Sequence, residues 1–113
     1  MTNELINRAV TELAAKAKEA YGNKLKQVIM FGSCARGDYT NESDIDVLLL
    51  LDVSAEEVPR ERKAIFPIVH DIDRNFNYEI LMAPIIQSYQ QFEEYVNVMP
   101  FYKNILREGV HYE

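Results

Sequence analysis

The chain has 113 residues, 48% of them hydrophobic, and a formal net charge of −6 at pH 7. This length fits one domain over residues 1–113, and the composition is that of a folded globular protein instead of a disordered one. No segment has the length and uniform apolarity of a membrane span and the start of the chain lacks a signal-peptide pattern, so we expect a cytoplasmic protein without a membrane partner.

The first half of the chain predicts one helix and two strands. Apolar residues recur at helical spacing over residues 3–21, and Gly22 is a suitable helix stop. Residues 25–31 (LKQVIMF) are short, apolar and partly β-branched, as in a buried strand. Residues 44–51 (DIDVLLLL) predict a second strand, buried on both faces beyond Asp46 because its apolar residues are continuous.

The middle of the chain predicts a long helix followed by a third strand. The helix covers residues 54–75, begins with a capping box of Ser54 and Glu57, and is kinked or split by Pro67. The third strand covers residues 76–82 (FNYEILM) and ends before Pro84.

The last part predicts two more helices. One is opened by residues 88–91 (SYQQ), and the other covers residues 100–108 with Gly109 at its end. Helices that alternate with strands predict an α/β (α+β) fold, a small mixed sheet with flanking helices. Aromatic side chains are frequent here and suit either a core or a docking surface: Tyr89, Phe92, Tyr95, Phe101 and Tyr102.

Charge is unevenly distributed along the chain. Residues 1–37 carry six basic and three acidic side chains, whereas residues 38–57 carry seven acidic and no basic ones. A local acidic excess favours a cation site and argues against an extended nucleic-acid-binding surface. We therefore expect no direct nucleic-acid partner.

Two aspartates stand at the start of the second predicted strand. Residues i and i+2 of a strand point to the same face, so Asp44 and Asp46 project side by side while Ile45 enters the core. Mg²⁺ prefers oxygen ligands and usually takes one or two protein carboxylates together with water and phosphate oxygens. The pair therefore predicts a magnesium site.

A Gly-Ser turn precedes this pair. A strand that ends at Gly32 and Ser33 and leads into a helix offers free backbone N–H groups to a phosphate. Arg36 follows one short turn later, where it either contacts a phosphate or forms an ion pair within the loop. Cys34 has no Cys or His partner and is interpreted as a spectator thiol.

Together these residues carry a family resemblance. The pattern Gly32-Ser33-x-Ala35-Arg36-Gly37, five residues, then Ser43-Asp44-x-Asp46 resembles the signature of the polymerase-β-like nucleotidyltransferase superfamily. Within it, the spacing and the small size are most similar to the minimal nucleotidyltransferases, and the order of elements is similar to their fold.

The resemblance implies transfer of a nucleoside monophosphate, typically from ATP, to an acceptor hydroxyl. Asp44 and Asp46 would hold one or two Mg²⁺ ions, and Gly32, Ser33, Arg36 and Ser43 would bind the nucleotide. Glu79 would stand at the third carboxylate position, where the family more often has Asp, as a metal ligand or as the general base for the acceptor hydroxyl. Family members commonly serve as antitoxins that adenylylate a tyrosine of a HEPN-domain toxin, which would make the assembly a hetero-oligomer.

Other interpretations remain open. The chain could retain the fold but act as a binding module that neutralises a partner by complex formation, or it could modify a small molecule. A second Asp-x-Asp, Asp71 and Asp73, falls on a predicted helix where the two side chains diverge, and is interpreted as a solvated face.

Overall fold

The computed structural model describes all residues, 1–113, as four strands and five α-helices with two short 3₁₀ turns. In chain order the elements are α1 (Asn3–Tyr21), η1 (Gly22–Lys24), β1 (Leu25–Phe31), α2 (Ser33–Arg36), β2 (Ile45–Leu51), η2 (Ala55–Glu57), α3 (Val58–Asn75), β3 (Met82–Ser88), α4 (Tyr89–Tyr95), α5 (Pro100–Glu108) and β4 (Val110–Tyr112).

The four strands form one mixed sheet in the order β3-β2-β1-β4. β1 runs antiparallel to both β2 and β4, and β2 runs parallel to β3. Across the sheet, Phe31 pairs with Asp46, which in turn pairs with Ala83. The mixed sheet with flanking helices confirms the predicted fold class.

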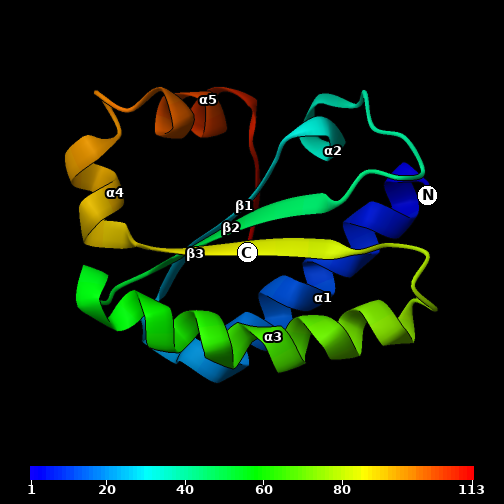
Figure 1. Cartoon of the computed structure of the whole chain (residues 1–113), viewed down its shortest axis with the longest axis horizontal. Coiled ribbons are helices and arrows are strands. Elements are labelled where there is room, and N and C mark those ends of the chain that lie inside the picture. Colours follow the sequence, from blue (N-terminus) through cyan, green and yellow to red (C-terminus); the bar gives the residue numbers. More distant parts are fainter.

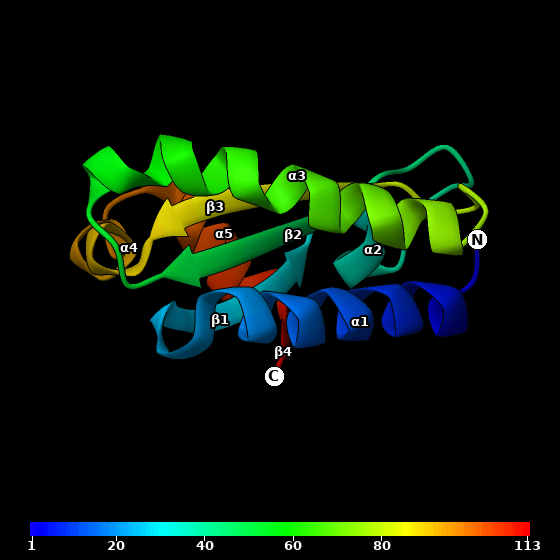
Figure 2. The same ribbon diagram turned by 90° about the horizontal axis from the view of Figure 1, so that it is seen from below.

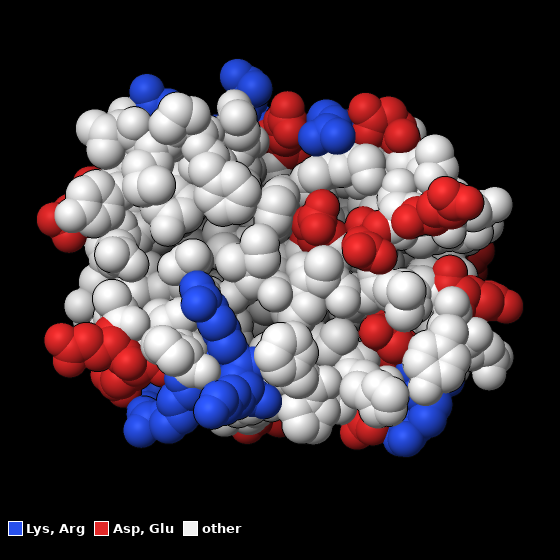
Figure 3. Space-filling view, in the orientation of Figure 1, with Lys and Arg blue, Asp and Glu red and all other residues white.

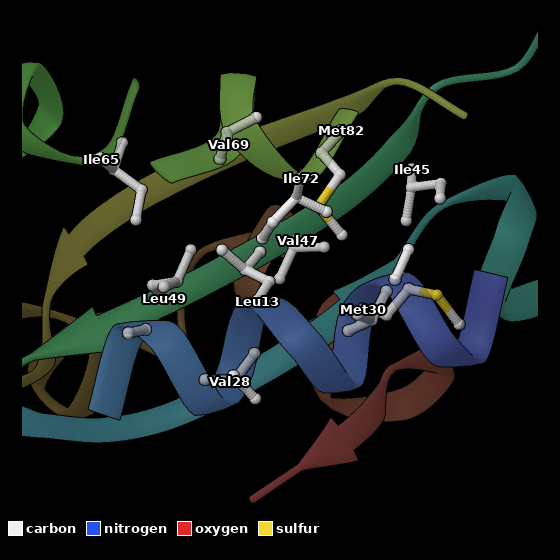
Figure 4. Packing of buried hydrophobic residues seen from close by; sticks show 14 of the residues in the cluster. Leu13, Val28, Met30, Ile45, Val47, Leu49, Ile65, Val69, Ile72 and Met82 are labelled. Carbon is white, nitrogen blue, oxygen red and sulfur yellow. The ribbon is translucent and has the colours of Figure 1, made fainter. Parts of the chain in front are cut away.

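Helices cover both faces of the sheet. α1 and α3 lie together on one face, and α4 and α5 lie on the other (Figures 1 and 2). The first face holds a core of 21 buried residues, part of which is seen in Figure 4, and the second holds six. No helix has the length and apolarity needed to cross a membrane.

Strand β2 contributes to both cores. Val47, Leu49 and Leu51 belong to the larger cluster, and Leu48 and Leu50 to the smaller one. All five are fully buried. This confirms that the strand is buried on both faces beyond Asp46.

Several predicted boundaries are confirmed. The periodic segments α1 and α5 and the apolar strand β1 have the predicted bounds. The Ser54 and Glu57 capping box is present at η2, and Gln91 N–H donates to Ser88 Oγ at 3.3 Å to begin α4. Pro67 does not split α3, which continues to Asn75, because the proline is on the exposed side where water can solvate the freed carbonyl.

The predicted third strand at residues 76–82 is wrong, because β3 runs from Met82 to Ser88. Asn77 and Tyr78 have φ of 57° and 56°, a left-handed conformation that reverses the chain after α3 and is incompatible with a strand. Pro84 lies inside β3 and does not end it. It is tolerated because β3 is an edge strand and the position of its missing N–H faces away from β2.

The short strand β4 was not predicted. It pairs with β1 through residues 110–112. Gly109 before it lies so close to Ile105 and Ile29 that a Cβ atom there would collide with both. Tyr112 Oη donates to Asn7 Oδ1 at 2.7 Å, which fixes β4 to α1.

Candidate active site

The turn after β1 is built around Gly32. Its φ of +74° is in the region that favours glycine. A Cβ atom at Gly32 would collide with the Asp46 carboxylate, which packs directly against this residue. The short helix α2 then begins at Ser33, so the first N–H groups of α2 have no acceptor inside the helix. The glycine therefore brings the turn and the carboxylate into contact.

The aspartate pair lies at the entrance of β2. Asp44 is exposed and Asp46 is half-buried. Burial and then the charge of Asp44 raise the pKa of Asp46 above its usual value, while Arg36 acts in the opposite direction. Acidic side chains gather on the half of the molecule that holds α2 and the entrance of β2, while basic ones gather over the first half of α3 (Figure 3).

Arg36 is the cation closest in chain position to this pair, and it already has two acidic partners. Its Nε donates to Asp38 Oδ2 at 3.3 Å and its Nη1 to Glu108 Oε2 at 3.4 Å. The loop ion pair that the sequence left open is therefore present, with a second one to α5. Because Arg36 is shared, the two aspartates are undercompensated, and a pair of undercompensated carboxylates fits a divalent cation.

Ser43 and Cys34 support the loop between α2 and β2. Ser43 Oγ accepts from Thr40 N–H at 2.9 Å, which closes a turn just before Asp44. The Cys34 thiol is buried and donates to the Asp44 carbonyl at 3.7 Å. Burial, followed by the charge of Asp46, raises the pKa of this thiol and keeps it protonated.

Glu79 is exposed in the loop before β3, not on a strand as predicted. Two residues later, the Leu81 carbonyl accepts from Ile45 N–H at 2.9 Å, so Glu79 belongs to the same end of the sheet as the aspartate pair. The β3 residue paired with Asp46 is Ala83, which has no side-chain oxygen. No three His, Cys, Asp or Glu residues are close enough together to hold a metal ion.

Asp73 departs from the solvated face expected of it. Asp71 is exposed and bound to Arg74 at 2.8 Å, but Asp73 is buried and its Oδ1 accepts from Met82 N–H at 3.2 Å. Desolvation raises the pKa of Asp73, and the charge of Asp44 adds to this shift. The buried position of Asp73 could be found from helical spacing, because Asp73 comes four residues after the buried Val69 and shares its face of α3.

A cleft that the sequence did not reveal lies beside the turn. It has a volume of about 300 Å³ and runs between α5 and the end of β1. Its lining includes Phe31, Gly32 and Arg36 on one side and Phe101, Asn104, Ile105 and Glu108 on the other. Of the aromatic residues near the end of the chain, Phe92 and Tyr102 are in the core, whereas Phe101 is 42% exposed at the cleft.

Comparisons with known proteins agree with this geometry. Three proteins of Methanocaldococcus jannaschii, each named as a proposed protein adenylyltransferase, are similar in sequence. The first is 35% identical over 104 residues, covering 90% of this chain and 92% of the relative. The second is 46% identical over 57% of this chain and 61% of the relative. The third is 32% identical over 76% of this chain and 57% of the relative.

A crystal structure of a proposed nucleotidyltransferase from Sulfolobus solfataricus has the same fold. It superposes with a TM-score of 0.51 at 22% identity, covering 96% of this chain and 82% of the other. The family model of the nucleotidyltransferase domain matches residues 10–109. The chain therefore belongs to the nucleotidyltransferase domain family, as its resemblance to the minimal nucleotidyltransferases predicts, and is an enzyme that transfers nucleotides.

Proposed function

We propose that this enzyme transfers AMP from ATP, in the presence of Mg²⁺, to a hydroxyl group on a partner protein. The observation that carries the nucleotide half of the proposal is the packing of Asp46 against Gly32, which joins two carboxylates to a phosphate-binding type of turn. The names of the three archaeal relatives support a protein as acceptor.

Each site residue has a proposed role in this reaction. Asp44 and Asp46 would hold the metal, which when bound neutralises triphosphate oxygens and the charge that develops during transfer. The backbone N–H of Ser33 and its hydroxyl would bind the triphosphate, and Ser43 would keep the loop before Asp44 closed. Arg36 would exchange its carboxylate partners for phosphate oxygens.

The transfer itself exchanges one bond for another. The acceptor oxygen forms a bond to the α-phosphorus, and the bond from this phosphorus to the pyrophosphate oxygen breaks. Glu79 is the candidate to accept the hydroxyl proton, since its exposed carboxylate is at the same end of the sheet as the aspartates.

The partner is proposed from family resemblance. Minimal nucleotidyltransferases commonly pair with HEPN-domain toxins, and we propose such a toxin as the acceptor, modified on a tyrosine within a hetero-oligomeric toxin–antitoxin complex. The exposed positions of Asp44 and Glu79 support an acceptor that comes from outside this domain.

Transfer of label from ATP to a HEPN-domain protein tests the proposal. With Mg²⁺, we expect the wild type to label the partner, Asp44→Asn/Asp46→Asn to lose at least about 100-fold in rate, and Glu79→Gln to lose at least about tenfold. Asp71→Asn is the matched control, since it removes an exposed aspartate outside the site.

Two outcomes would contradict the proposal. If the double variant labels the partner as fast as the wild type, the aspartates do not hold the metal. If no label transfers while the double variant still neutralises the partner, the protein acts by complex formation.

A further inference from the structure

The cleft between α5 and the end of β1 adjoins the turn to which the proposed function assigns the triphosphate. Phe31 lines this cleft and pairs in the sheet with Asp46. Neighbouring strands are about 4.8 Å apart, and paired residues of an antiparallel ladder point to the same face. The cleft is therefore one strand away from the carboxylates, on the face to which they point.

The walls of the cleft suit a flat apolar group. The Phe31 and Phe101 rings have centroids 5.7 Å apart and planes at 89°, so they form two perpendicular surfaces. Ile105 adds aliphatic surface on the same side. Exposed aromatic rings in a groove that follows a phosphate backbone are the usual stacking platform for bases.

The rim of the cleft carries hydrogen-bonding groups. Asn104 Oδ1 accepts from Arg107 Nη2 at 3.0 Å, which leaves the Asn104 amide N–H₂ group to donate to a ligand. Glu108 supplies a carboxylate acceptor, which Arg36 contacts at 3.4 Å. One donor, from Asn104, and one acceptor, from Glu108, beside the two phenylalanine rings are complementary to the polar edge of a base.

On the other side of the aspartate pair, the β3 residue paired with Asp46 and its exposed neighbour Leu81 offer neither feature. There β3 presents Ala83 next to Asp46 and an exposed Leu81 before it. Neither side chain has an aromatic surface or a polar atom. A nucleoside attached to phosphates at Gly32 and Ser33 therefore finds an aromatic surface next to this turn toward α5.

We propose that the cleft between α5 and β1 binds the nucleoside of the triphosphate substrate, with its base against Phe101. This inference rests on the proposed function, because it assumes that the triphosphate binds at Gly32 and Ser33. It assigns α5 to substrate binding and makes Phe101 a determinant of nucleotide affinity. Arg36, at the boundary of turn and cleft, would contact the phosphates and leave Glu108 Oε2 free for the base, while Glu108 Oε1 keeps its ion pair with Arg107.

Calorimetric titration of the full chain with ATP, and separately with inorganic tripolyphosphate, tests this assignment in the presence of Mg²⁺. Tripolyphosphate occupies the phosphate turn but has no nucleoside. We expect Phe101→Ala to weaken ATP binding at least about fivefold, as loss of one base–aromatic stack does, and to leave tripolyphosphate binding unchanged. Phe101→Tyr, which keeps the ring, should bind ATP as the wild type does.

Two further variants keep the test decisive. Phe66→Ala is the matched control, because this phenylalanine is 60% exposed on α3, away from the cleft. Phe101→Leu keeps apolar packing without a ring and replaces Phe101→Ala if circular dichroism shows that the alanine variant is unfolded.

The outcomes separate the two proposals. Wild type that binds neither ATP nor tripolyphosphate contradicts the proposed function itself. If the wild type, Phe101→Ala and Phe101→Leu all bind ATP with the same affinity, only the assignment of the cleft to the nucleoside is contradicted. Equal weakening of ATP and tripolyphosphate by these variants also overturns the cleft assignment, because the phenylalanine would then act on the phosphates.

Discussion

At the scale of single residues, the site joins groups that destabilise the free protein. Asp44 and Asp46 repel each other, and Asp46 is half-buried against Gly32. The nearby cation that compensates Asp46 is Arg36, which also forms ion pairs with Asp38 and Glu108. The residues proposed to bind a cation thus lower the stability of the protein while no cation is bound.

The raised pKa of Asp46 predicts how stability changes with pH. Because folding raises this pKa above its usual 3.8, the associated stability is fully present below pH 3.8 and is lost as pH rises through the raised value. Asp46→Asn is uncharged, so at pH 7 without divalent cations it should unfold about 2–5 °C above the wild type. This difference should shrink toward zero near pH 3.

Thermal unfolding followed by circular dichroism from pH 3 to 8 in chelator measures this effect. Asp71→Asn, which removes an exposed and ion-paired aspartate, controls for the change in net charge. A wild type that is as stable as Asp46→Asn at pH 7 would show that burial and the charge of Asp44 do not disfavour the Asp46 carboxylate in the folded protein.

Two glycines in a left-handed backbone conformation differ in whether a Cβ atom at the position would also collide with a neighbour. Gly32 and Gly37 have φ of +74° and +90°, so alanine at either position should cost about 1–2 kcal/mol of folding free energy. Only at Gly32 would the new Cβ collide with Asp46, since nothing lies within 4 Å at Gly37.

We expect Gly32→Ala to lower the rate of nucleotide transfer more than tenfold and Gly37→Ala to change it less than threefold, as measured with labelled ATP. Equal rates in the two variants would refute the role of the close packing.

At the scale of elements, patterns that depend on local spacing were predicted well. The α1, β1 and α5 bounds follow from periodicity, turn residues and helix caps, all of which are local. The third strand was predicted too early in the sequence because a proline such as Pro84 usually ends a strand. Only the order of strands in the sheet shows that β3 is an edge strand, where proline is tolerated. β4 has three residues and no periodicity, so its pairing with β1 is a tertiary effect.

The same distinction holds within the site. Gly32, Asp44 and Asp46 are close in sequence, so one motif and the two-residue repeat of a strand selected them as candidates, but the packing of Asp46 against Gly32 is seen only in the structure. The α5 cleft was not predictable, because it requires that a helix near residue 100 packs beside residue 32. The buried position of Asp73 was available from helical phase, but its exposed neighbour Asp71 suggested a solvated face.

Asp73 links α3 to β3, and its bond to Met82 N–H gives a prediction for this junction. Asp73→Ala leaves the N–H without its acceptor and should cost about 1–3 kcal/mol of folding free energy. Asp73→Asn keeps an oxygen acceptor and removes a charge that burial disfavours, so its stability should stay within about 0.5 kcal/mol of the wild type. Urea unfolding measures both, and equal destabilisation by the two variants would contradict the hydrogen-bonding role.

At the scale of the whole molecule, the sheet is closed by residues distant in sequence. Tyr112 in β4 reaches Asn7 in α1 across 105 residues. Removal of residues 110–113 should lower the free energy of unfolding by about 2–4 kcal/mol, because it exposes the edge of β1 and removes the Tyr112 side chain. Removal of Glu113 alone, which lies outside β4, should have little effect in the same urea titration. A full-length stability in the longer deletion would show that β4 contributes nothing.

This long-range closure has a consequence for synthesis of the protein. A nascent chain that has released residues 25–88 from the ribosome possesses β1, β2 and β3, and with them both aspartates and the Gly32 turn. It still lacks α5, and therefore one wall of the cleft, and it lacks the fourth strand. Because a chain generally folds from its N-terminal part first, the residues proposed to hold the metal are in place before the proposed nucleoside cleft is complete. The proposed nucleoside site would therefore be complete only after α5 has left the ribosome.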